Sequence, residues 1–402
     1  MRNILIEELQ QLPIDKKMVE VVERKGTGHP DHICDGAMNQ VSIELSKEYI
    51  KKFGRVLHHN TDKCLLAAGR ASLAFGGGRI DEPMLMVMGD RATYESEGIE
   101  IPVEEIAVNA TKKWFKENLR FVEPDKNVCF QNQLRKGSAE LTDIFSRKKG
   151  MLDANDTSAA VGYAPMSKLE RLVLDTELFL NSKEFKKQHP ESGEDIKVMG
   201  LRVHDEFHLT VAMAFVGRFI DSEQDYFSKK KEMLEEIRTF VVEKVGKKSK
   251  IDFNTLDVHG RGVNGVYLTV LGTSAEDGDS GQVGRGNRVN GIIPLNRPIS
   301  NEAAAGKNPV SHVGKIYNLL THKMANHIYK ETTGLDEVYV WLLSQIGQPV
   351  DQPKVIAVQL VGKEKNSDPK SLSMQIEEII EEELSDIQSF CKSLTEGKIP
   401  VC

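Results

Sequence analysis

Helical and strand-like segments alternate along the chain without the regular strand–helix–strand spacing of a doubly wound fold. Amphipathic spacing predicts helices over residues 35–53, 102–119, 226–245, 313–328 and 372–394. Apolar runs predict strands over residues 64–75, 83–88, 207–216, 265–271, 338–343 and 355–361. Because the two kinds of element are interspersed irregularly, the sequence predicts an α+β (mixed) fold rather than a parallel α/β sheet.

The length and composition indicate an ordinary globular protein of several domains. The chain has 402 residues, of which 40% are hydrophobic and 28% charged, and domains of about 150 residues each would give two to three of them. No linker rich in Pro, Gly or Ser separates these domains. We therefore expect domains that are interleaved in the sequence.

The net charge and the cysteines limit the class of binding partner and the cellular compartment that we expect. The formal net charge is −7, which disfavours nucleic acid as the main partner. The five cysteines form no CxxC pair, which is typical of a reducing compartment. No apolar run is long enough for a membrane helix, and the N-terminus lacks a signal-peptide core. We expect a cytoplasmic protein with no membrane partner.

Two apparent nucleotide-binding motifs do not fit their contexts. Residues 260–265 read GRGVNG and match GxGxxG, but a polar stretch precedes them and a strand follows. A dinucleotide site needs a strand before the motif and a helix after it. Residues 305–308 read AGKN and lack the hydroxyl residue of a P-loop. Lys307 remains a candidate phosphate ligand.

The densest group of functional side chains is the segment KGTGHPD at residues 25–31, directly before the first predicted helix. A helix N-terminus offers free N–H groups and partial positive charge to an anion. His29 adds a donor, and the carboxylate of Asp31 fits beside an anion when Mg²⁺ bridges the two. The segment therefore predicts a magnesium–phosphate site, with an aspartate cap and a loop histidine as the alternative.

Four other segments also combine acids, bases and glycine turns. They are HHNTDK at 58–63, NDTS at 155–158 with GYAP at 162–165, GDSGQVGRG at 278–286, and GKNPVSHVGK at 306–315. Each taken alone is also typical of a turn or a helix cap. Together they would supply acids for a metal and bases for a polyphosphate.

These segments resemble the motifs of archaeal-type methionine adenosyltransferases (S-adenosylmethionine synthetases). The resemblance rests on GHPD, LHHNTDK, DTS with VGYAP, DSGQVGRGN and AAAGKNPVSHVGKIYN. It runs from about Val21 to beyond Lys315, and SQIGQP at residues 344–349 continues it. Several long motifs in a fixed order are far more specific than any single one.

The bacterial and eukaryotic branch of that family is more distant, although its GHPD, GDQGxxFGYA, DAGLTGRK and SGKDPTKVDRS segments still align. The departures are Ser158 for glycine, Gly286 for lysine, Asn308 for aspartate, His312 for lysine, and Gly314 for a metal-binding aspartate. The comparison leaves one metal ligand and one phosphate cation unassigned, and it does not place the potassium site of that branch.

The resemblance implies that the methionine sulfur attacks C5′ of ATP and expels tripolyphosphate, which is then hydrolysed to pyrophosphate and phosphate. The implied catalytic residues, all facing the triphosphate, are His29, Lys307 and Arg285. The implied substrate-binding residues are Asp279, Asp156, Ser158, Gly137, Ser138, Lys63, Asp62 and His312. Asp31 is the implied Mg²⁺ ligand, and K⁺ is a second candidate cofactor.

The resemblance also implies a fold of three similar α+β subdomains in a pseudo-threefold arrangement, built from non-contiguous segments. The approximate ranges are 18–125 with the GHPD loop, 126–265 with part of 1–17, and 266–402 with the Asp279, Arg285 and Lys307 loops. The implied partners are ATP, L-methionine and a second copy of the chain. The active sites would lie at the interface of this homodimer, or of a higher oligomer.

Two other function classes would use the same residue types. Another ATP-using enzyme, such as a kinase or a ligase, would also need cationic loops and acidic metal ligands. A non-catalytic nucleotide-binding protein could keep the fold, although it would have no need for His29, Asp31, Asp279, Arg285 and Lys307 together. The products formed from ATP and methionine would separate these classes.

Overall fold

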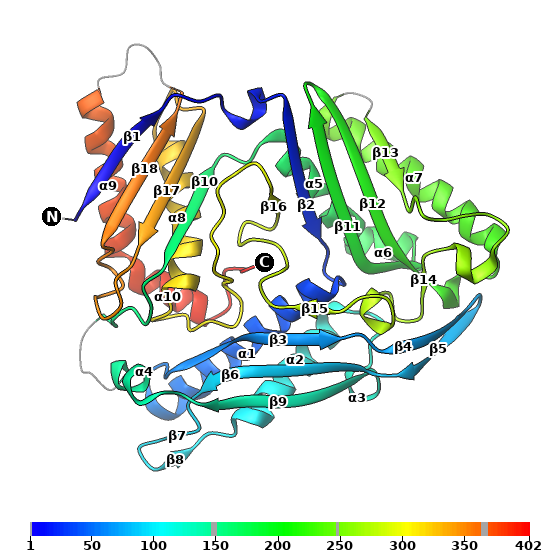
Figure 1. Cartoon of the computed structure of the whole chain (residues 1–402), viewed down its shortest axis with the longest axis horizontal. Coiled ribbons are helices and arrows are strands. Elements are labelled where there is room, and N and C mark those ends of the chain that lie inside the picture. Colours follow the sequence, from blue (N-terminus) through cyan, green and yellow to red (C-terminus); the bar gives the residue numbers. More distant parts are fainter. Residues whose placement is uncertain (1, 146–150, 247–248, 363–368) are drawn as a thin grey trace.

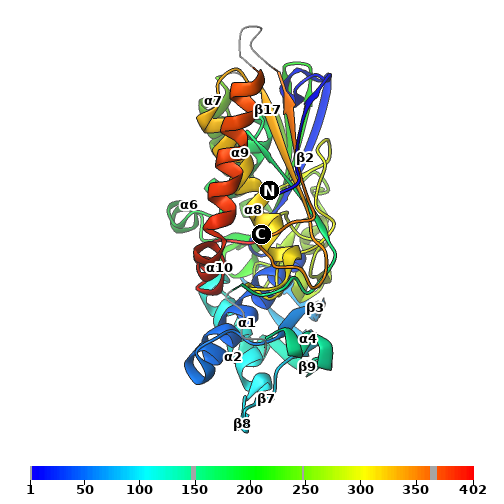
Figure 2. The same cartoon turned by 90° about the vertical axis from the view of Figure 1, so that its left-hand side faces the viewer.

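The computed structural model describes residues 2–145, 151–246, 249–362 and 369–402. Within these residues, three sheets carry most of the strands, and the main helices cover one side of each sheet (Figures 1 and 2). A mixed α+β fold, as expected, is therefore confirmed.

Sheet A takes its strands from both ends of the chain. Its order is β1 (Ile4–Leu9), β18 (Val355–Val361), β17 (Glu337–Leu343) and β10 (Ala159–Ala164). Helix α8 (Val313–Glu331) packs on β10 and β17, and α9 (Pro369–Ser385) packs on α8. Helix α10 (Ile387–Thr395) follows α9, so the predicted helix 372–394 is divided in two.

Sheet B has the strand order β13 (Lys250–Phe253), β12 (Glu206–Val216), β11 (Ser192–Val203), β2 (Val19–Lys25) and β16 (Ile293–Pro294). The short strand β14 (Leu268–Thr269) also pairs with β12. Helix α5 (Lys168–Leu180) packs on β11 and β2, and α7 (Glu223–Val245) packs on α5. The short α6 (Lys183–Gln188) leads into β11.

Sheet C lies below the other two in Figure 1, with the order β15 (Gly281–Gln282), β3 (His59–Ala67), β6 (Met84–Ala92) and β9 (Val128–Lys136). Helix α1 (Pro30–Phe53) packs on β3, and α2 (Val103–Asn118) packs on α1. The other short elements are β4 (Arg70–Ala74), β5 (Gly77–Glu82), β7 (Glu95–Ser96), β8 (Ile99–Glu100), α3 (Pro124–Asn127) and α4 (Ala139–Ile144).

The sheets cross the ranges predicted for the domains. β2 lies within 18–125 but pairs with β11 of sheet B, and β9 lies within 126–265 but pairs with β6 of sheet C. β15, from the range 266–402, pairs with β3. The segments are thus interleaved at the level of single strands, while the division into three domains stays a prediction.

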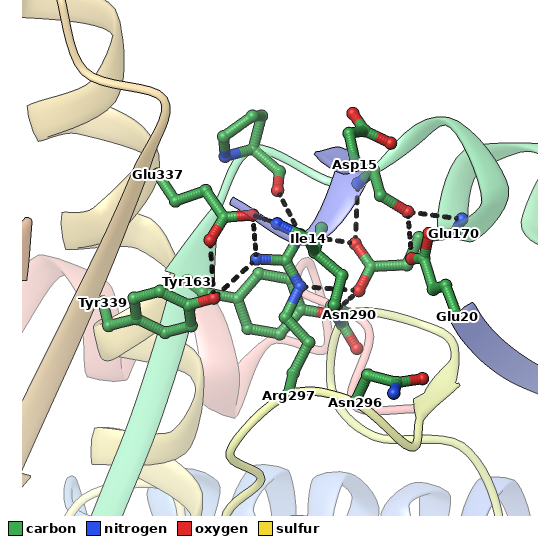
Figure 3. A network of polar contacts seen from close by, with 12 residues as sticks. Ile14, Asp15, Glu20, Tyr163, Glu170, Asn290, Asn296, Arg297, Glu337 and Tyr339 are labelled. Carbon is green, nitrogen blue, oxygen red and sulfur yellow. Dashed lines mark hydrogen bonds and ion pairs between the residues drawn. The ribbon is translucent and has the colours of Figure 1, made fainter. Parts of the chain in front are cut away.

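The apolar core is divided between the sheets. One continuous cluster of buried residues joins sheets A and C through α1 and α8, and a second cluster fills the space between sheet B and its helices. Figure 3 shows a buried polar network around Arg297 that ties sheet A to sheet B. The Arg297 guanidinium contacts Glu170 of α5 at 2.9 Å and Glu337 of β17 at 3.1 Å.

None of the helices in the described part of the chain is long and apolar enough to cross a membrane. The cytoplasmic location stays a prediction.

Candidate active site

Helix α1 begins at the GHPD segment because three local features favour a start there. His29 is the N-cap, Pro30 occupies the first turn, and the His29 Nδ1 atom accepts the backbone N–H of Asp31 at 3.2 Å. Proline costs nothing in the first turn, since its missing N–H would have no helical partner. The helix ends at Gly54, whose φ of 68° is left-handed.

The His29 side chain is buried and electrically neutral at pH 7. Burial, followed by the charge of Lys25, lowers the pKa of His29 to about 4. Because Nδ1 accepts a hydrogen bond, the neutral ring carries its proton on Nε2. The Nε2–H of His29 therefore lies at the N-terminus of a helix with no hydrogen-bond partner in the described part of the chain, which suits an anion.

Asp31 is held by a backbone group and by a cation. Its Oδ1 accepts the N–H of Gln282 at 2.8 Å, and its Oδ2 lies 2.8 Å from Lys25 Nζ. Lys25 Nζ also donates to the carbonyl of Arg285 at 2.7 Å. The structure thus brings the GHPD segment and the 278–286 loop together.

The close approach of this loop to α1 requires two of its glycines. A Cβ atom at Gly281 would lie 2.1 Å from the Pro30 carbonyl oxygen, and one at Gly286 would lie 2.2 Å from Asp35 Oδ2. The lysine that the more distant branch carries at position 286 would therefore displace the Asp35 carboxylate here. Glycine at these two positions lets the loop pack on the start of the helix.

Asp35 is an acid of this site that our sequence reasoning missed. It lies one turn after Asp31 on the same face of α1, and that spacing was the available signal. Its Oδ1 accepts the N–H of Gly284 at 2.8 Å, while its Oδ2 has no hydrogen-bond partner among the described residues. Burial raises the pKa of Asp35 to about 7.

A second charged cluster surrounds Lys307. Its Nζ forms ion pairs with Asp62 and, at 3.0 Å, with Glu302. Burial by itself raises the pKa of Asp62, but the contacts with Lys307, followed by the contacts with Lys63 and Asp90, together lower it. Lys63 Nζ contacts the same Asp62 carboxylate at 2.6 Å. The structure therefore places Asp62, Lys63 and Lys307 together.

Helix α8 begins beside this cluster with the same type of cap as α1. His312 is the N-cap, and its Nδ1 accepts the N–H of Gly314 at 3.2 Å. Burial, followed by the charge of Lys307, lowers the pKa of His312 to about 3. Lys315 in the first turn donates to Asn39 Oδ1 of α1 at 2.9 Å.

Helix α1 connects the two clusters. Asp31 and Asp35 face the 278–286 loop, whereas Asn39 contacts Lys315, and Ser42 Oγ donates to the Lys307 carbonyl at 3.0 Å. The eight residues from Asp31 to Asn39 correspond to about 12 Å along a helix axis. The acidic cluster and the Asn39 contact to the cationic cluster thus lie on the same helix, less than three turns apart.

Gly137 and Ser138 lie near the start of β3. A Cβ atom at Gly137 would meet His58 Nδ1 at 2.5 Å, so the turn packs against the segment that carries Asp62. Ser138 is the N-cap position of the short α4. The His58 Nδ1 atom is buried without a hydrogen-bond partner among the described residues.

Asp156 and Ser158 are held by the segment 344–350 through backbone contacts. Ser344 Oγ donates to the Asp156 carbonyl and accepts the Ser158 N–H, both at 2.8 Å. The neighbouring Asn155 N–H donates to the Ser311 carbonyl at 3.2 Å, directly before the cap of α8. The DTS segment therefore adjoins the Lys307 cluster.

Asp279 and Arg285 stand at the exposed edge of the 278–286 loop. Asp279 Oδ1 accepts the N–H of Ser280 at 2.8 Å. The Arg285 side chain is exposed and makes no hydrogen bond or ion pair within the described residues. The structure places both residues beside the GHPD segment but brings neither into contact with His29 or Lys307.

Within the part of the chain that the structure describes, no three His, Cys, Asp or Glu side chains form a group that could hold a metal ion. The carboxylate of Asp31 and the carbonyl of Arg285 already converge on one cation, the Lys25 ammonium. A metal at this position would take few ligands from the protein.

The chain matches a family model along almost its whole length. The model of S-adenosylmethionine synthetase (AdoMet synthetase) matches residues 2–398. A probable S-adenosylmethionine synthase of Aquifex aeolicus is 45% identical over 387 residues, which cover 96% of each chain. The S-adenosylmethionine synthase of Methanothrix thermoacetophila is 49% identical over 364 residues, and these cover 90% of each chain.

A solved structure agrees in fold. An S-adenosylmethionine synthetase from Campylobacter jejuni, described as unusual, superimposes with a TM-score of 0.56 at 16% identity and covers 92% of this chain and 89% of its own. These matches confirm the resemblance and the enzyme class, methionine adenosyltransferase, that the sequence motifs predicted. The chain belongs to the S-adenosylmethionine synthetase family.

Proposed function

We propose that the chain forms S-adenosyl-L-methionine from ATP and L-methionine by attack of the methionine sulfur on C5′ of ATP. Tripolyphosphate leaves and is then hydrolysed to pyrophosphate and phosphate. One observation carries this proposal: the acidic cluster at Asp31 and the cationic cluster at Lys307 both contact α1, and each lies beside a histidine-capped helix N-terminus, that of α1 or that of α8. Such a pair of sites suits a metal-bound polyphosphate.

The chemistry of the attack explains why the site is rich in cations rather than in bases. A thioether sulfur has no proton to lose, so no general base is required. The barrier lies in the negative charge that builds up on the leaving oxygen. Groups placed to receive that charge lower the barrier, and an alignment of sulfur, C5′ and oxygen supplies much of the rest.

His29 is the donor to the bridging oxygen. Its Nε2–H is fixed by the hydrogen bond that Nδ1 accepts from Asp31 N–H. A neutral donor stabilises negative charge without itself releasing a proton.

Lys307, Arg285, His312 and Lys63 hold the phosphates. Lys307 is now paired with Asp62 and Glu302, so the incoming polyphosphate would share this cation with them. Arg285 is exposed at the edge of its loop and can reach a bound ligand without breaking an ion pair of the described residues.

The remaining residues serve the adenosine and methionine ends of the site. Asp279 and Asp156 are carboxylates that could receive the methionine ammonium or a ribose hydroxyl, and Ser158 adds a polar group beside Asp156. Gly137 and Ser138 pack against the β3 start that carries Asp62, and we assign them to the ATP pocket.

Mg²⁺ is the proposed cofactor, and Asp31 is its proposed ligand. Mg²⁺ is usually held by one or two carboxylates together with substrate phosphates, so a group of three protein ligands is not required. Asp31 has oxygen atoms of the right chemistry, and the Arg285 carbonyl stands at the same position. Bound there, the metal would neutralise phosphate charge.

We expect Asp31→Asn to raise the Mg²⁺ concentration needed for half-maximal activity, and an unchanged requirement would exclude this ligand. K⁺ as a second cofactor stays a prediction.

We further propose a homodimer with active sites at the subunit interface. The face of sheet C opposite its helices exposes apolar side chains, with Leu65 47% and Leu85 36% exposed, and Val87 stands beside Leu65 across the strand pair. Exposed apolar patches of this kind mark protein–protein interfaces. Sedimentation of the wild-type chain and of Leu65→Glu tests the assembly, and a wild-type monomer at micromolar concentration would contradict it.

The products formed from ATP, methionine and Mg²⁺ test the reaction. Mass spectrometry should detect S-adenosylmethionine, pyrophosphate and phosphate. Release of ADP would indicate a kinase and release of AMP a ligase, and the absence of turnover would indicate a binding protein.

A further inference from the structure

Lys25 occupies a position that the proposed mechanism does not use. It is the last residue of β2, its side chain is 13% exposed, and its ammonium lies between two oxygen atoms, Asp31 Oδ2 at 2.8 Å and the Arg285 carbonyl at 2.7 Å. A carboxylate and a carbonyl converging on one point are the hard oxygen ligands that Mg²⁺ also selects.

The backbone of Lys25 is fixed by a single side chain. Asn287 Oδ1 accepts the Lys25 N–H at 2.9 Å, and Asn287 Nδ2 donates to the Lys25 carbonyl at 2.8 Å. The pairing of β2 with β16 ends two residues earlier, at Glu23 and Ile293. The Asn287 amide therefore continues this pairing at the point where the Lys25 side chain must be aimed.

We propose that Lys25 is a built-in counter-cation that holds the Asp31 site in the absence of metal, and that Asn287 positions it. This inference rests on the proposed function, because it gives Asp31 a role toward Mg²⁺. When a metal–polyphosphate binds, the ammonium yields Asp31 to the metal and turns to the phosphates that arrive with it. The free enzyme thereby keeps its buried carboxylate paired and binds metal only weakly before the nucleotide.

The Lys25 ammonium should have opposite effects on the binding of the metal ion and on the binding of the polyphosphate. Two like charges competing for one carboxylate repel each other at short range, so Lys25 weakens metal binding to the free protein. The same ammonium attracts a polyanion, so it strengthens polyphosphate binding once the metal has taken Asp31. A residue with a merely structural role would weaken or spare both.

The test uses the full chain and Mn²⁺ as the probe, with free Mn²⁺ measured by electron paramagnetic resonance in the absence of nucleotide. Lys25→Met should bind Mn²⁺ about tenfold more tightly than wild type, which corresponds to about 1.4 kcal/mol. With saturating Mg²⁺, the same variant should bind tripolyphosphate more weakly. Unchanged or weaker Mn²⁺ binding by Lys25→Met would overturn the proposal.

Lys197 offers a matched control. It stands directly opposite Lys25 in the pairing of β11 with β2, but its ammonium pairs with Glu23 at 3.0 Å. Lys197→Met removes the same charge from the neighbouring position and should leave Mn²⁺ binding unchanged. A tighter binding by both variants would show an effect of net charge and not of the Lys25 contact.

Asn287→Ala provides a second route if Lys25→Met does not fold. It releases the Lys25 backbone without removing the charge, so it should tighten Mn²⁺ binding by a smaller factor, and no tightening would again overturn the proposal. Formation of S-adenosylmethionine by the wild type is measured separately. If it occurs while Mn²⁺ binding does not respond, this inference fails and the proposed function stands.

Discussion

The N-termini of α1 and α8 use the same cap but carry opposite charges. In both helices a buried histidine caps the first turn, and its Nδ1 accepts the N–H of the second residue after it at 3.2 Å. At α1 that second residue is Asp31, an acid. At α8 it is Gly314, followed by the buried Lys315 and flanked by Lys307.

The difference shows how one local structure can serve two electrostatic roles. An acid near a helix N-terminus interacts favourably with the helix dipole, and the Asp31 carboxylate already pairs with a cation, the Lys25 ammonium. Lys315 lies in the first turn of α8, where the dipole opposes a positive charge. Burial, followed by the charge of Lys307, lowers the pKa of Lys315 to about 7. Such an unfavourable placement is typical of functional sites, and here it would favour an anion.

The largest expected effect concerns the buried ion pair of the cationic cluster. Lys307→Met leaves the buried carboxylate of Asp62 without its main partner and should lower the free energy of unfolding by about 3 kcal/mol, measured with urea. Lys25→Met should cost less, since the Lys25 side chain is 13% exposed and that of Lys307 only 2%. Equal losses would show that this difference in burial does not affect stability. The double variant Lys307→Met/Asp62→Leu should regain most of the stability but not the activity.

The second prediction concerns the donor at α1. His29→Ala should lower kcat for S-adenosylmethionine formation by about 100- to 1000-fold, the usual loss for one donor to a developing negative charge. His29→Asn keeps a good N-cap and should show the same loss with a native unfolding curve. Near-normal turnover in either variant would remove His29 from the mechanism. The same change at His312 should raise the KM for ATP more than it lowers kcat.

The third prediction uses the pKa values of the two histidines. The pKa of His312 is about 3 in the folded chain, against about 6.5 in an unfolded one, so below pH 6.5 the unfolded chain binds a proton that the folded chain does not. The contribution of His312 to the free energy of unfolding is fully present above pH 6.5 and decreases as the pH falls toward 3. On acidification, the wild type should therefore lose up to about 1.4 kcal/mol more unfolding free energy per pH unit than His312→Asn does.

The control for this pH effect lies at the other helix. The pKa of His29 in the folded chain is about 4. His29→Asn should therefore lose less unfolding free energy than the wild type does only down to about pH 4. Urea unfolding at several pH values measures both curves. A wild-type slope in His312→Asn would mean that His312 is not buried in the neutral form.

The smallest expected effect is that of the caps themselves. At pH 7, the alanine variant of either histidine should have an unfolding free energy about 1 kcal/mol lower than that of the asparagine variant. The reason is that alanine cannot accept the N–H of the first turn. The costs at α1 and α8 should be equal within experimental error. A marked inequality would show that the two caps are not equivalent, contrary to their geometry.

Local patterns predicted much of the fold. The helix expected over 313–328 is observed as Val313–Glu331, and the strand over 355–361 as Val355–Val361, because strong periodicity marks such segments. The strand expected over 265–271 is reduced to Leu268–Thr269, since the N–H groups of Val270 and Leu271 donate to the Glu276 carboxylate and not to a neighbouring strand. Helix α5 and strands β2 and β11 were missed, and both partners of β2, which are β11 and β16, lie far away in the sequence.

The sequence by itself determined the family, the chemical character of the site and the start of α1, because ordered motifs and a proline at a helix start are local features. The tertiary structure alone decided that Asp35 and Lys25 belong to the Asp31 cluster and that Lys307 pairs with Asp62. Those contacts join segments more than 200 residues apart or depend on how the Lys25 backbone is held by Asn287. Hydrophobic periodicity carries no information about such contacts, because they depend on how loops that are distant in the sequence pack against α1.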